Sequence, residues 1–310
     1  MNVNNLVGKL AGFYTLSGFN AFKRKYWDFT DKIVSEADLK RVFSEFDTIV
    51  VGSDQIWNSA CIKTMGLYYF GIDADLDRQK LIAYAPSFGK NRFDTTKDNV
   101  IQLTEHLKRF RAISVRESDG VSLLKKYFGI DNAIKVLDPT MLMDKDYYLR
   151  LAGVKDLKRK DTLAYYLLDN NEEKMEYINR ISQDLGLRPV NLYLAKDSGI
   201  PVIGKLKSLK YPSVEYWLRS IAESQMVVTD SFHGTVFSIL FNRDFVTFGN
   251  AERGNSRFEN LLTMFDLKDR IADLRKGYRQ KFPAIDYLQV NSKLEDLRQI
   301  SQSFLKEALT

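Results

Sequence analysis

Apolar residues in the first half of the chain fall into short β-branched runs, each closed by a polar residue, a glycine or a proline. Such runs are typical of strands buried on both faces of a parallel sheet. Between them apolar positions recur at helical spacing. The pattern predicts strands at 47–52, 80–85, 111–115 and 133–137, with helices over 100–110 and 118–128.

The same alternation restarts after the polar stretch 153–160. It predicts strands at 162–168, 189–194, 226–229 and 244–248, and helices at 172–185, from Val214, after His233 and at 258–265. Strands that alternate with helices form parallel sheets covered by helices. A final amphipathic segment carries Leu294, Leu297, Phe304, Leu305 and Ala308 at helical spacing.

A chain of 310 residues exceeds the size of one ordinary core, so the pattern predicts two domains. We expect an α/β fold with two doubly wound, Rossmann-like domains, over 1–150 and 151–290, and a helix at 291–310 that crosses back to the first. Two such domains that face each other place a ligand cleft between the carboxyl ends of their strands.

Composition removes several classes of protein. Hydrophobic residues make up 45% and charged residues 28%, the balance of an ordered globular chain. The single cysteine, Cys61, allows no internal disulfide and is expected to be a buried thiol. Two histidines are too few for the usual zinc sites, so no metal is predicted. No GxGxxG fingerprint is present, which argues against a dinucleotide cofactor and a dehydrogenase.

The net charge of +6 favours anionic partners such as phosphates, acidic glycans or a membrane surface. The basic clusters lack the aromatic pattern of a nucleic-acid surface, so no nucleic-acid partner is expected. They lie at 23–25, 205–210 and 275–281. No apolar stretch has the length of a membrane span or of a secretory leader. We therefore expect a cytoplasmic protein.

The segment from Val227 to Phe237 carries the strongest chemical signal. Asp230, Ser231 and His233 follow a buried strand where a helix begins, and the free backbone N–H groups of that first turn can bind an anion. Gly234 would let a ligand approach the backbone, and Thr235 follows it. The alternative, equally weighted on position alone, is that Asp230 or Ser231 caps the helix and His233 is an interior histidine.

Two further strand ends are polar. Arg116 directly follows the run 111–115 and could bind a carboxylate or phosphate, or pair with Glu117 or Asp138. After the strand at 47–52, polar side chains could hydrogen-bond sugar hydroxyls and an indole could stack on a sugar face, although turn and cap roles are as common. These residues are Ser53, Asp54, Gln55, Trp57 and Asn58.

The loop 253–258 is the fourth polar segment. Arg253 and Arg257 could supply charge for an anion, with a surface loop capped by Ser256 as the alternative. His106 lies within a predicted helix without a polar strand end, and we expect a structural role.

These ordered segments resemble the polysaccharide pyruvyl transferase family. The similarity runs from about Phe46 to Leu274 and includes VVGSDQIWN, AYAPSFG, ISVRESDG, VLDPTML, VVTDSFHGTVFSILF and RFENLL. Membership implies a two-domain, glycosyltransferase-B-like fold. It also implies transfer of an enolpyruvyl group from phosphoenolpyruvate to two hydroxyls of a saccharide of a capsule, exopolysaccharide or lipid-linked precursor, which forms a pyruvate ketal.

The resemblance also assigns roles. His233 becomes the acid or donor-binding group, Arg116 holds the donor's carboxylate or phosphate, and the helix start at 233–235 receives the phosphate, with no metal or cofactor required. Asp230 is grouped with them as catalytic. Ser231, Gly234, Thr235, the polar loop after the first strand and the two arginines of 253–257 become substrate-binding. The basic clusters suggest contact with the inner face of a membrane.

Two departures from the family pattern leave alternatives open. Some members carry an arginine where this chain has Ser231. Members also open with a strand and a glycine-containing loop, whereas here a KRK-bearing, helical segment at 20–29 leads in, so we expect a shortened N-terminal domain. The alternatives are a nucleotide-sugar glycosyltransferase and a catalytically reduced saccharide- or phosphate-binding protein.

Overall fold

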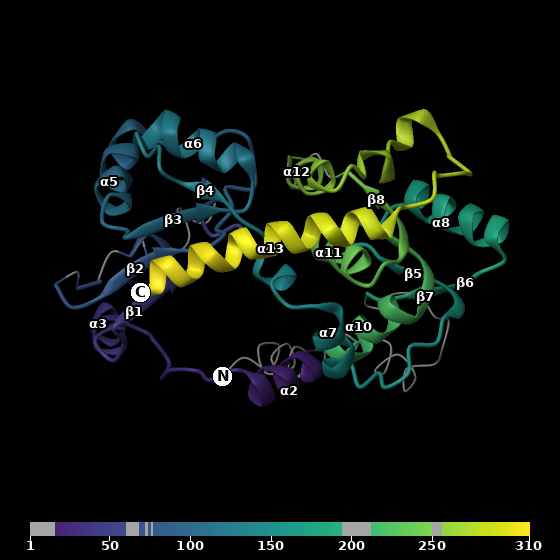
Figure 1. The fold of residues 1–310 in the computed structure, drawn as a ribbon, viewed down its shortest axis with the longest axis horizontal. Coiled ribbons are helices and arrows are strands. Elements are labelled where there is room, and N and C mark those ends of the chain that lie inside the picture. The colour runs from purple at the N-terminus through teal and green to yellow at the C-terminus, as the bar shows by residue number, and fades with distance from the viewer. Residues whose placement is uncertain (1–15, 60–67, 72–73, 76, 194–211, 250–255) are drawn as a thin grey trace, which may run out of the picture. The chain divides into compact units, whose positions relative to one another are not determined.

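The computed structural model describes residues 16–59, 68–71, 74–75, 77–193, 212–249 and 256–310, which form two compact units, each with its own parallel sheet (Figure 1). The first unit takes its described residues from 30–143, 250–268 and 286–310. The second takes them from 1–29, 144–249 and 269–285. Cys61, Arg253 and the cluster at 205–210 lie outside the described residues.

This division differs from the predicted domain boundaries in two places. Helix α2 (Ser17–Tyr26), expected in the first domain, belongs to the second unit, where a Cβ added to Gly18 would lie 3.1 Å from the Cα of Ser213. Helix α12 (Ser256–Met264), expected in the second domain, belongs to the first, where Asn260 accepts a hydrogen bond from the backbone N–H of Ser118 at 3.1 Å. Tertiary contacts of this kind leave no periodic signal in the sequence.

The sheet of the first unit contains four parallel strands in the order in which they occur along the chain. They are β1 (Thr48–Val51), β2 (Lys80–Ala83), β3 (Ala112–Val115) and β4 (Ile134–Lys135). The strands lie in chain order, so every crossover steps in the same direction, and crossovers of the usual right hand place the connecting helices α5 (Lys97–Leu107) and α6 (Ser118–Phe128) on one face. The described part of this unit is therefore singly wound, and the prediction of a doubly wound first domain is wrong for it.

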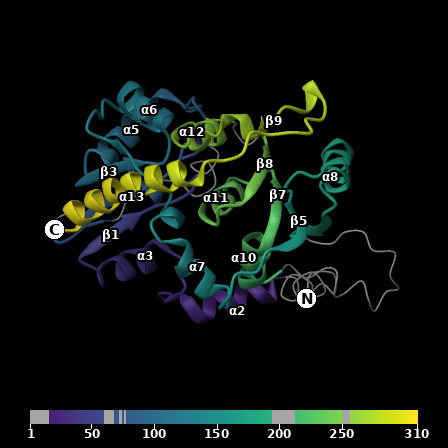
Figure 2. The same ribbon diagram turned by 45° about the vertical axis from the view of Figure 1, so that its right-hand side comes forward.

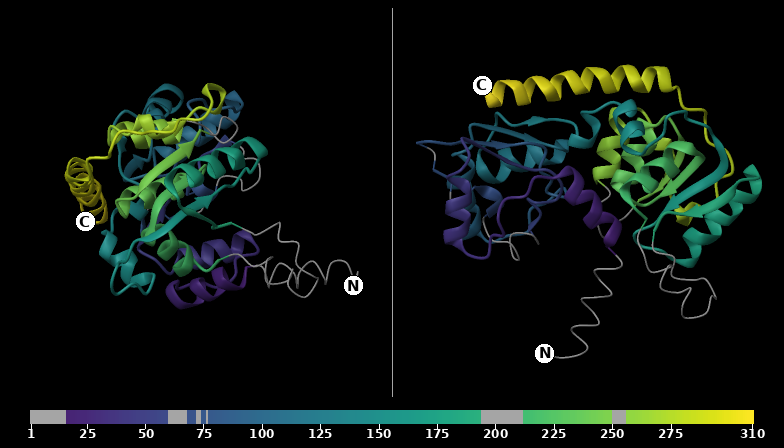
Figure 3. Two further views of the ribbon diagram at one scale, coloured as in Figure 1. Left: turned by 90° about the vertical axis from the view of Figure 1, so that its right-hand side faces the viewer. Right: turned by 90° about the horizontal axis from the view of Figure 1, so that it is seen from below.

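The other face of this sheet is covered by helix α13 (Tyr287–Leu309), which runs along it (Figure 3, right). Its apolar side joins a small core cluster that contains Tyr84, Ala85, Val136, Phe304 and Leu305. The hydroxyl of Ser301 accepts from the backbone N–H of Leu137 at 2.9 Å, and the ammonium of Lys80 donates to the last carbonyl oxygens of the helix. The C-terminal helix thus covers the face of the sheet that α5 and α6 leave uncovered.

The second unit is doubly wound. Its sheet has the order β6-β5-β7-β8-β9, with strands β5 (Lys160–Tyr166), β6 (Arg188–Asn191), β7 (Ser224–Thr229), β8 (Asp244–Phe248) and β9 (Ile271–Ala272). Helix α8 (Glu172–Leu185) covers one face, and α10 (Val214–Glu223) and α11 (Phe232–Leu240) cover the other (Figure 2). The strand order reverses between β5 and β7, which is where doubly wound proteins bind ligands.

Most predicted elements are present with small changes at their ends. Strand β4 is shorter than predicted because the N–H of Leu137 bonds to α13 instead of a strand. Strand β2 ends early because Ala85 adopts a positive φ of 53°. The pattern did not predict α3 (Glu36–Phe43), α7 (Lys145–Leu151) or the 3₁₀ turns at Tyr68–Phe70, Pro139–Met141, Lys268–Arg270 and Leu274–Lys276. Among the described residues, no helix has both the length and the apolar character needed to cross a membrane.

Candidate functional site

In the first unit the guanidinium of Arg116 contacts carboxylates that lie at the carboxyl ends of the strands. Arg116 donates to Asp138 at 2.7 Å, to Glu117 at 3.1 Å and to Asp54 at 3.2 Å. Glu117 also accepts from the hydroxyl of Ser87 at 2.8 Å. These residues follow four different strands, and parallel strands bring their carboxyl ends to one edge of a sheet.

Arg116 itself is buried, with 3% of its side chain exposed. Burial alone lowers the pKa of a guanidinium, but the charges of Glu117, Asp138 and Asp54 outweigh it and raise the pKa of Arg116. Of the two roles open for Arg116, the described contacts are those of the pairing with Glu117 and Asp138. In this structure the guanidinium of Arg116 donates hydrogen bonds to carboxylates of the protein itself.

Glu117 is also buried, and burial raises the pKa of its carboxyl above the ordinary range, although Arg116 and the hydroxyl of Ser87 act in the opposite direction. Three carboxylates share the cation of Arg116, and although the charge of Arg257 also acts to lower the pKa of Glu117, burial outweighs these charges. From the sequence, Asp138 and Glu117 are expected only as pairing partners of Arg116. In the structure both carboxylates are buried at the centre of this cluster.

Asp54 is the member of the cluster that faces solvent, with 61% of its side chain exposed. Its backbone has a positive φ of 65°, and its carbonyl oxygen accepts from the N–H of Ser87 at 2.7 Å. One carboxylate oxygen is bonded to the buried Arg116. The arrangement presents an oriented carboxylate that can accept a proton or a hydroxyl hydrogen bond.

The remaining predicted residues of this loop surround Asp54. The hydroxyl of Ser53 donates to the carbonyl of Ala85 at 2.9 Å. With its amide oxygen turned toward Arg257, Gln55 lies 2.8 to 2.9 Å from the nitrogens of that half-buried guanidinium. Gly89, at a positive φ of 74°, packs so closely that an added Cβ would lie 2.8 Å from the amide nitrogen of Asn58. Arg257 therefore belongs to the same cluster as the loop after β1.

The environment of Trp57 differs from the one that the sequence predicts. Its side chain is fully buried, its indole N–H donates to the carbonyl of Tyr69 at 2.9 Å, and its ring stacks on Phe70 with 5.4 Å between centroids. The prediction that it stacks on a sugar is wrong, because the apolar core of this unit encloses the indole. The polar residues around it in sequence turn outward while Trp57 anchors their loop.

In the second unit the strand-to-helix junction after β7 is built as the sequence predicts, but Asp230 has a different role. Its carboxylate has no exposed surface and accepts from the N–H groups of Leu168 at 2.6 Å and Asp169 at 3.1 Å and from the ammonium of Lys174 at 2.7 Å. A fully enclosed carboxylate cannot touch a substrate. The assignment of Asp230 as catalytic is wrong, and its role is to hold the strand ends.

The next residues form the start of α11. Ser231 is its N-cap, accepting from the N–H of Gly234 at 3.3 Å, and the buried hydroxyl of Thr235 donates to the carbonyl of Ser231 at 3.1 Å. A Cβ on Gly234 would lie 2.4 Å from the hydroxyl oxygen of Thr229, so this glycine permits close packing of helix on strand rather than of a ligand on backbone. His233 is half-buried, the least enclosed of the predicted residues at this junction.

Lys174 was missed by the sequence analysis, because a lysine in the first turn of an amphipathic helix normally points to solvent. Asp138 was visible as a polar residue after a strand, and its position before Pro139 was the available signal. Among the described residues, no three His, Cys, Asp or Glu side chains come together as a metal site would require.

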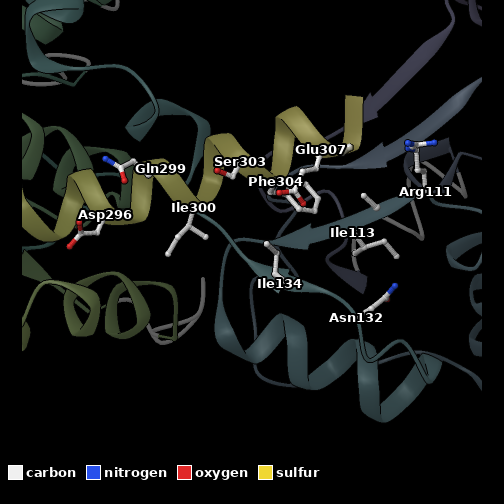
Figure 4. Close-up of a pocket in the computed structure, with 12 residues that line it drawn as sticks. Arg111, Ile113, Asn132, Ile134, Asp296, Gln299, Ile300, Ser303, Phe304 and Glu307 are labelled. Atoms are coloured by element: carbon white, nitrogen blue, oxygen red, sulfur yellow. The ribbon is translucent and has the colours of Figure 1, made fainter. Parts of the chain in front are cut away.

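A groove of about 910 Å³ lies elsewhere in the first unit (Figure 4). It runs between α13 and the amino-terminal end of β3, and its lining includes Arg111, Asn132, Ile134, Gln299, Ile300 and Glu307. The polar cluster around Arg116 lies at the opposite, carboxyl end of β3. The groove is therefore separate from the chemistry described above.

Two parallel, helix-covered sheets whose polar side chains collect at the carboxyl ends of the strands define an α/β protein of the kind that places its ligands at strand ends. The model of one family, polysaccharide pyruvyl transferase, matches residues 11–252, and the chain belongs to that family. No curated protein matches the chain.

Proposed function

We propose that this protein transfers the enolpyruvyl group of phosphoenolpyruvate to two hydroxyls of a saccharide and so forms a pyruvate ketal in surface or exopolysaccharide biosynthesis. The observation that carries the proposal is family membership over residues 11–252 together with a half-buried imidazole, His233, in the first turn of α11. The facing of two domains across a shared cleft, as in glycosyltransferase-B-like folds, stays a prediction.

The reaction needs one proton donor and proton acceptors. A proton added to the methylene carbon leaves the central carbon oxocarbenium-like, and a saccharide hydroxyl adds to that carbon and loses its proton. Phosphate then leaves with the bonding electron pair, and the second hydroxyl adds and gives up its proton, which closes the ketal. We assign the donor role to His233 and the acceptor role for the first hydroxyl to Asp54.

The surroundings of Asp54 suit a saccharide. Ser53, Gln55 and Asn58 offer hydroxyl and amide groups on the same loop, and sugar hydroxyls pair with such groups. Arg257, beside Gln55, supplies cationic charge for the anionic donor, and we keep Arg253 in the same role. Arg116 becomes a positioning residue that orients Asp54 through the contact described above.

The test is release of phosphate from phosphoenolpyruvate in the presence of saccharides that end in galactose, glucose, mannose or their N-acetyl forms. We expect release with at least one of them, loss of more than about a hundredfold in His233→Gln, and little change in the control His106→Gln. Asp54→Asn should lower kcat, and Arg257→Met should raise KM for phosphoenolpyruvate. Wild-type rates in His233→Gln would reject the assignment of the acid.

A saccharide-binding protein without transfer is the second candidate. It is favoured by the burial of Arg116 and Asp230 and by the use of Ser231 as a helix cap where some family members carry an arginine. It predicts a saccharide-dependent rise in thermal stability with no phosphate release. Release of a nucleoside diphosphate from a nucleotide sugar would instead support the glycosyltransferase alternative.

We propose that the protein acts in the cytoplasm, at the inner face of the membrane when its acceptor is lipid-linked. The basic end of α2, Lys23 to Lys25, suits anionic lipid. Sedimentation with phosphatidylglycerol vesicles, compared with phosphatidylcholine vesicles, tests the contact. Equal recovery with both would reject it.

A further inference from the structure

Lys174 is enclosed in a way that is unusual for a lysine near the start of a surface helix. Only 8% of its side chain is exposed. Its ammonium donates to the carboxylate of Asp230 and to the backbone carbonyl of Asp169, both at 2.7 Å. It also lies 5.8 Å from the centre of the ring of Phe248. Anion, carbonyl dipole and aromatic ring together stabilise the buried charge.

The three contacts come from the ends of three neighbouring strands. Asp169 follows β5, Asp230 follows β7, and Phe248 is the last residue of β8. Strands β5 and β7 flank the point where the strand order reverses. The ammonium of Lys174 therefore links the ends of β5 and β7, the strand ends at which a doubly wound sheet binds its ligand.

Asp230 carries this connection to the helix start. Its two oxygens accept from the N–H groups of Leu168 and Asp169, so the carboxylate fixes the loop after β5 against the end of β7. The hydroxyl of the next residue, Ser231, caps α11, and His233 stands in the first turn. The position of the Asp230 carboxylate therefore sets the direction in which α11 starts, and with it the direction in which the imidazole of His233 points.

We propose that Lys174 is a positioning residue for His233: its ammonium fixes Asp230, and with it the strand-to-helix turn that aims the imidazole. Without the ammonium, the buried carboxylate must take up a proton or admit water, and the turn relaxes. Displacements of about 1 Å at a reacting group cost roughly a hundredfold in rate. The kinetic part of this proposal rests on the proposed function of His233, whereas the positional part does not.

The positional part is tested by nuclear magnetic resonance on protein with ¹³C-labelled histidine. The chain has two histidines, so two imidazole signals are expected, and His106→Gln assigns them. In Lys174→Met we expect the His233 signal to move or broaden while the His106 signal stays in place. Arg180→Met is the matched control on the same helix, since Arg180 is 55% exposed and pairs with Glu176, and it should shift neither signal.

The kinetic part separates positioning from stability. Lys174→Met leaves the charge of Asp230 buried alone and should lower both stability and kcat. Lys174→Met with Asp230→Asn removes that charge while an amide oxygen can still accept from Leu168, so stability should recover. If Lys174 only stabilises the fold, kcat recovers too. We expect kcat to stay roughly 10- to 100-fold below wild type with KM little changed.

The double variant, Lys174→Met with Asp230→Asn, decides the question. An unmoved His233 signal in the double variant, or wild-type kcat in it, overturns the proposal. If Lys174→Met does not fold, Lys174→Gln and Asp230→Asn are measured in the same way, and unmoved signals in both overturn it equally. Absence of phosphate release in wild type would refute the proposed function alone, because the imidazole signals report position without turnover.

Discussion

The guanidinium of Arg116 and the carboxylate of Asp138 are bonded at 2.7 Å, and each side chain is only 3% exposed. Buried ion pairs of this kind add little when intact, because desolvation offsets attraction, but removal of one partner leaves a charge that the interior cannot compensate. Arg116 is the cation shared by three carboxylates. Loss of the arginine should therefore cost more than loss of any single acid.

We expect Arg116→Met to lower the free energy of unfolding by about 3 to 5 kcal/mol, measured by urea denaturation near neutral pH. The control Arg92→Met removes an exposed ion pair with Asp94 and should cost less than about 1 kcal/mol. Addition of Asp138→Asn to Arg116→Met should restore part of the loss. Equal stability of the two single variants would contradict this account of the cluster.

Trp57 and Trp27 form a matched pair with opposite environments, since Trp57 is fully buried and Trp27 is 52% exposed. Truncation of a buried indole removes its packing and leaves a cavity, so Trp57→Ala should destabilise the protein by about 3 to 5 kcal/mol. Trp27→Ala should change stability by less than about 0.5 kcal/mol. Thermal and urea unfolding measure both. Weaker saccharide binding by Trp57→Ala at unchanged stability would revive the stacking role that burial argues against.

Ser301 joins α13 to the edge of the first sheet. Its hydroxyl is buried and accepts from the N–H of Leu137, so Ser301→Ala leaves that donor without this acceptor. The expected loss is about 1 to 3 kcal/mol. Ser303→Ala, at an exposed position on the same helix, should be nearly neutral. Hydrogen exchange at Leu137 should speed up in the first variant and stay unchanged in the second.

The pH dependence of stability should contain a contribution from His106. Burial, assisted by the charge of Arg109, lowers the pKa of this imidazole from its ordinary 6.5. The folded protein then binds fewer protons than the unfolded chain as pH falls below 6.5, so the contribution is present above that pH and is lost on acidification toward the folded pKa. Urea unfolding at about pH 7.5 and 5.5 should show a smaller difference in His106→Gln. A folded-state pKa above 6.5 by nuclear magnetic resonance would reverse the sign.

The repeating strand and helix pattern was sufficient to place most elements, because buried parallel strands and amphipathic helices each have a characteristic spacing of apolar residues. The same pattern located the strand ends that carry Asp54, Arg116 and Asp230. It could not tell which of these side chains would face solvent. All three are polar residues after a strand, yet only Asp54 is exposed.

Enclosure of a charged residue depends on partners distant in sequence. The buried charge of Arg116 is paired with Asp138 and Asp54, which follow other strands. The buried charge of Asp230 is paired with Lys174 of α8. The environment of Trp57 was misread for the same reason, since its indole stacks on Phe70, which comes from a separate segment of the chain. Local composition records the residue but not its neighbours in space.

By itself the sequence determined the α/β class, the family and the strand ends where polar groups gather, because these follow from periodicity and from motifs contiguous along the chain. Only the tertiary structure decided which charges are buried in pairs, that α13 covers the bare face of the first sheet, and that Lys174 pairs with Asp230 just before the helix that bears His233. Those decisions depend on contacts between residues tens to hundreds of positions apart, whose energies come from desolvation and packing in three dimensions.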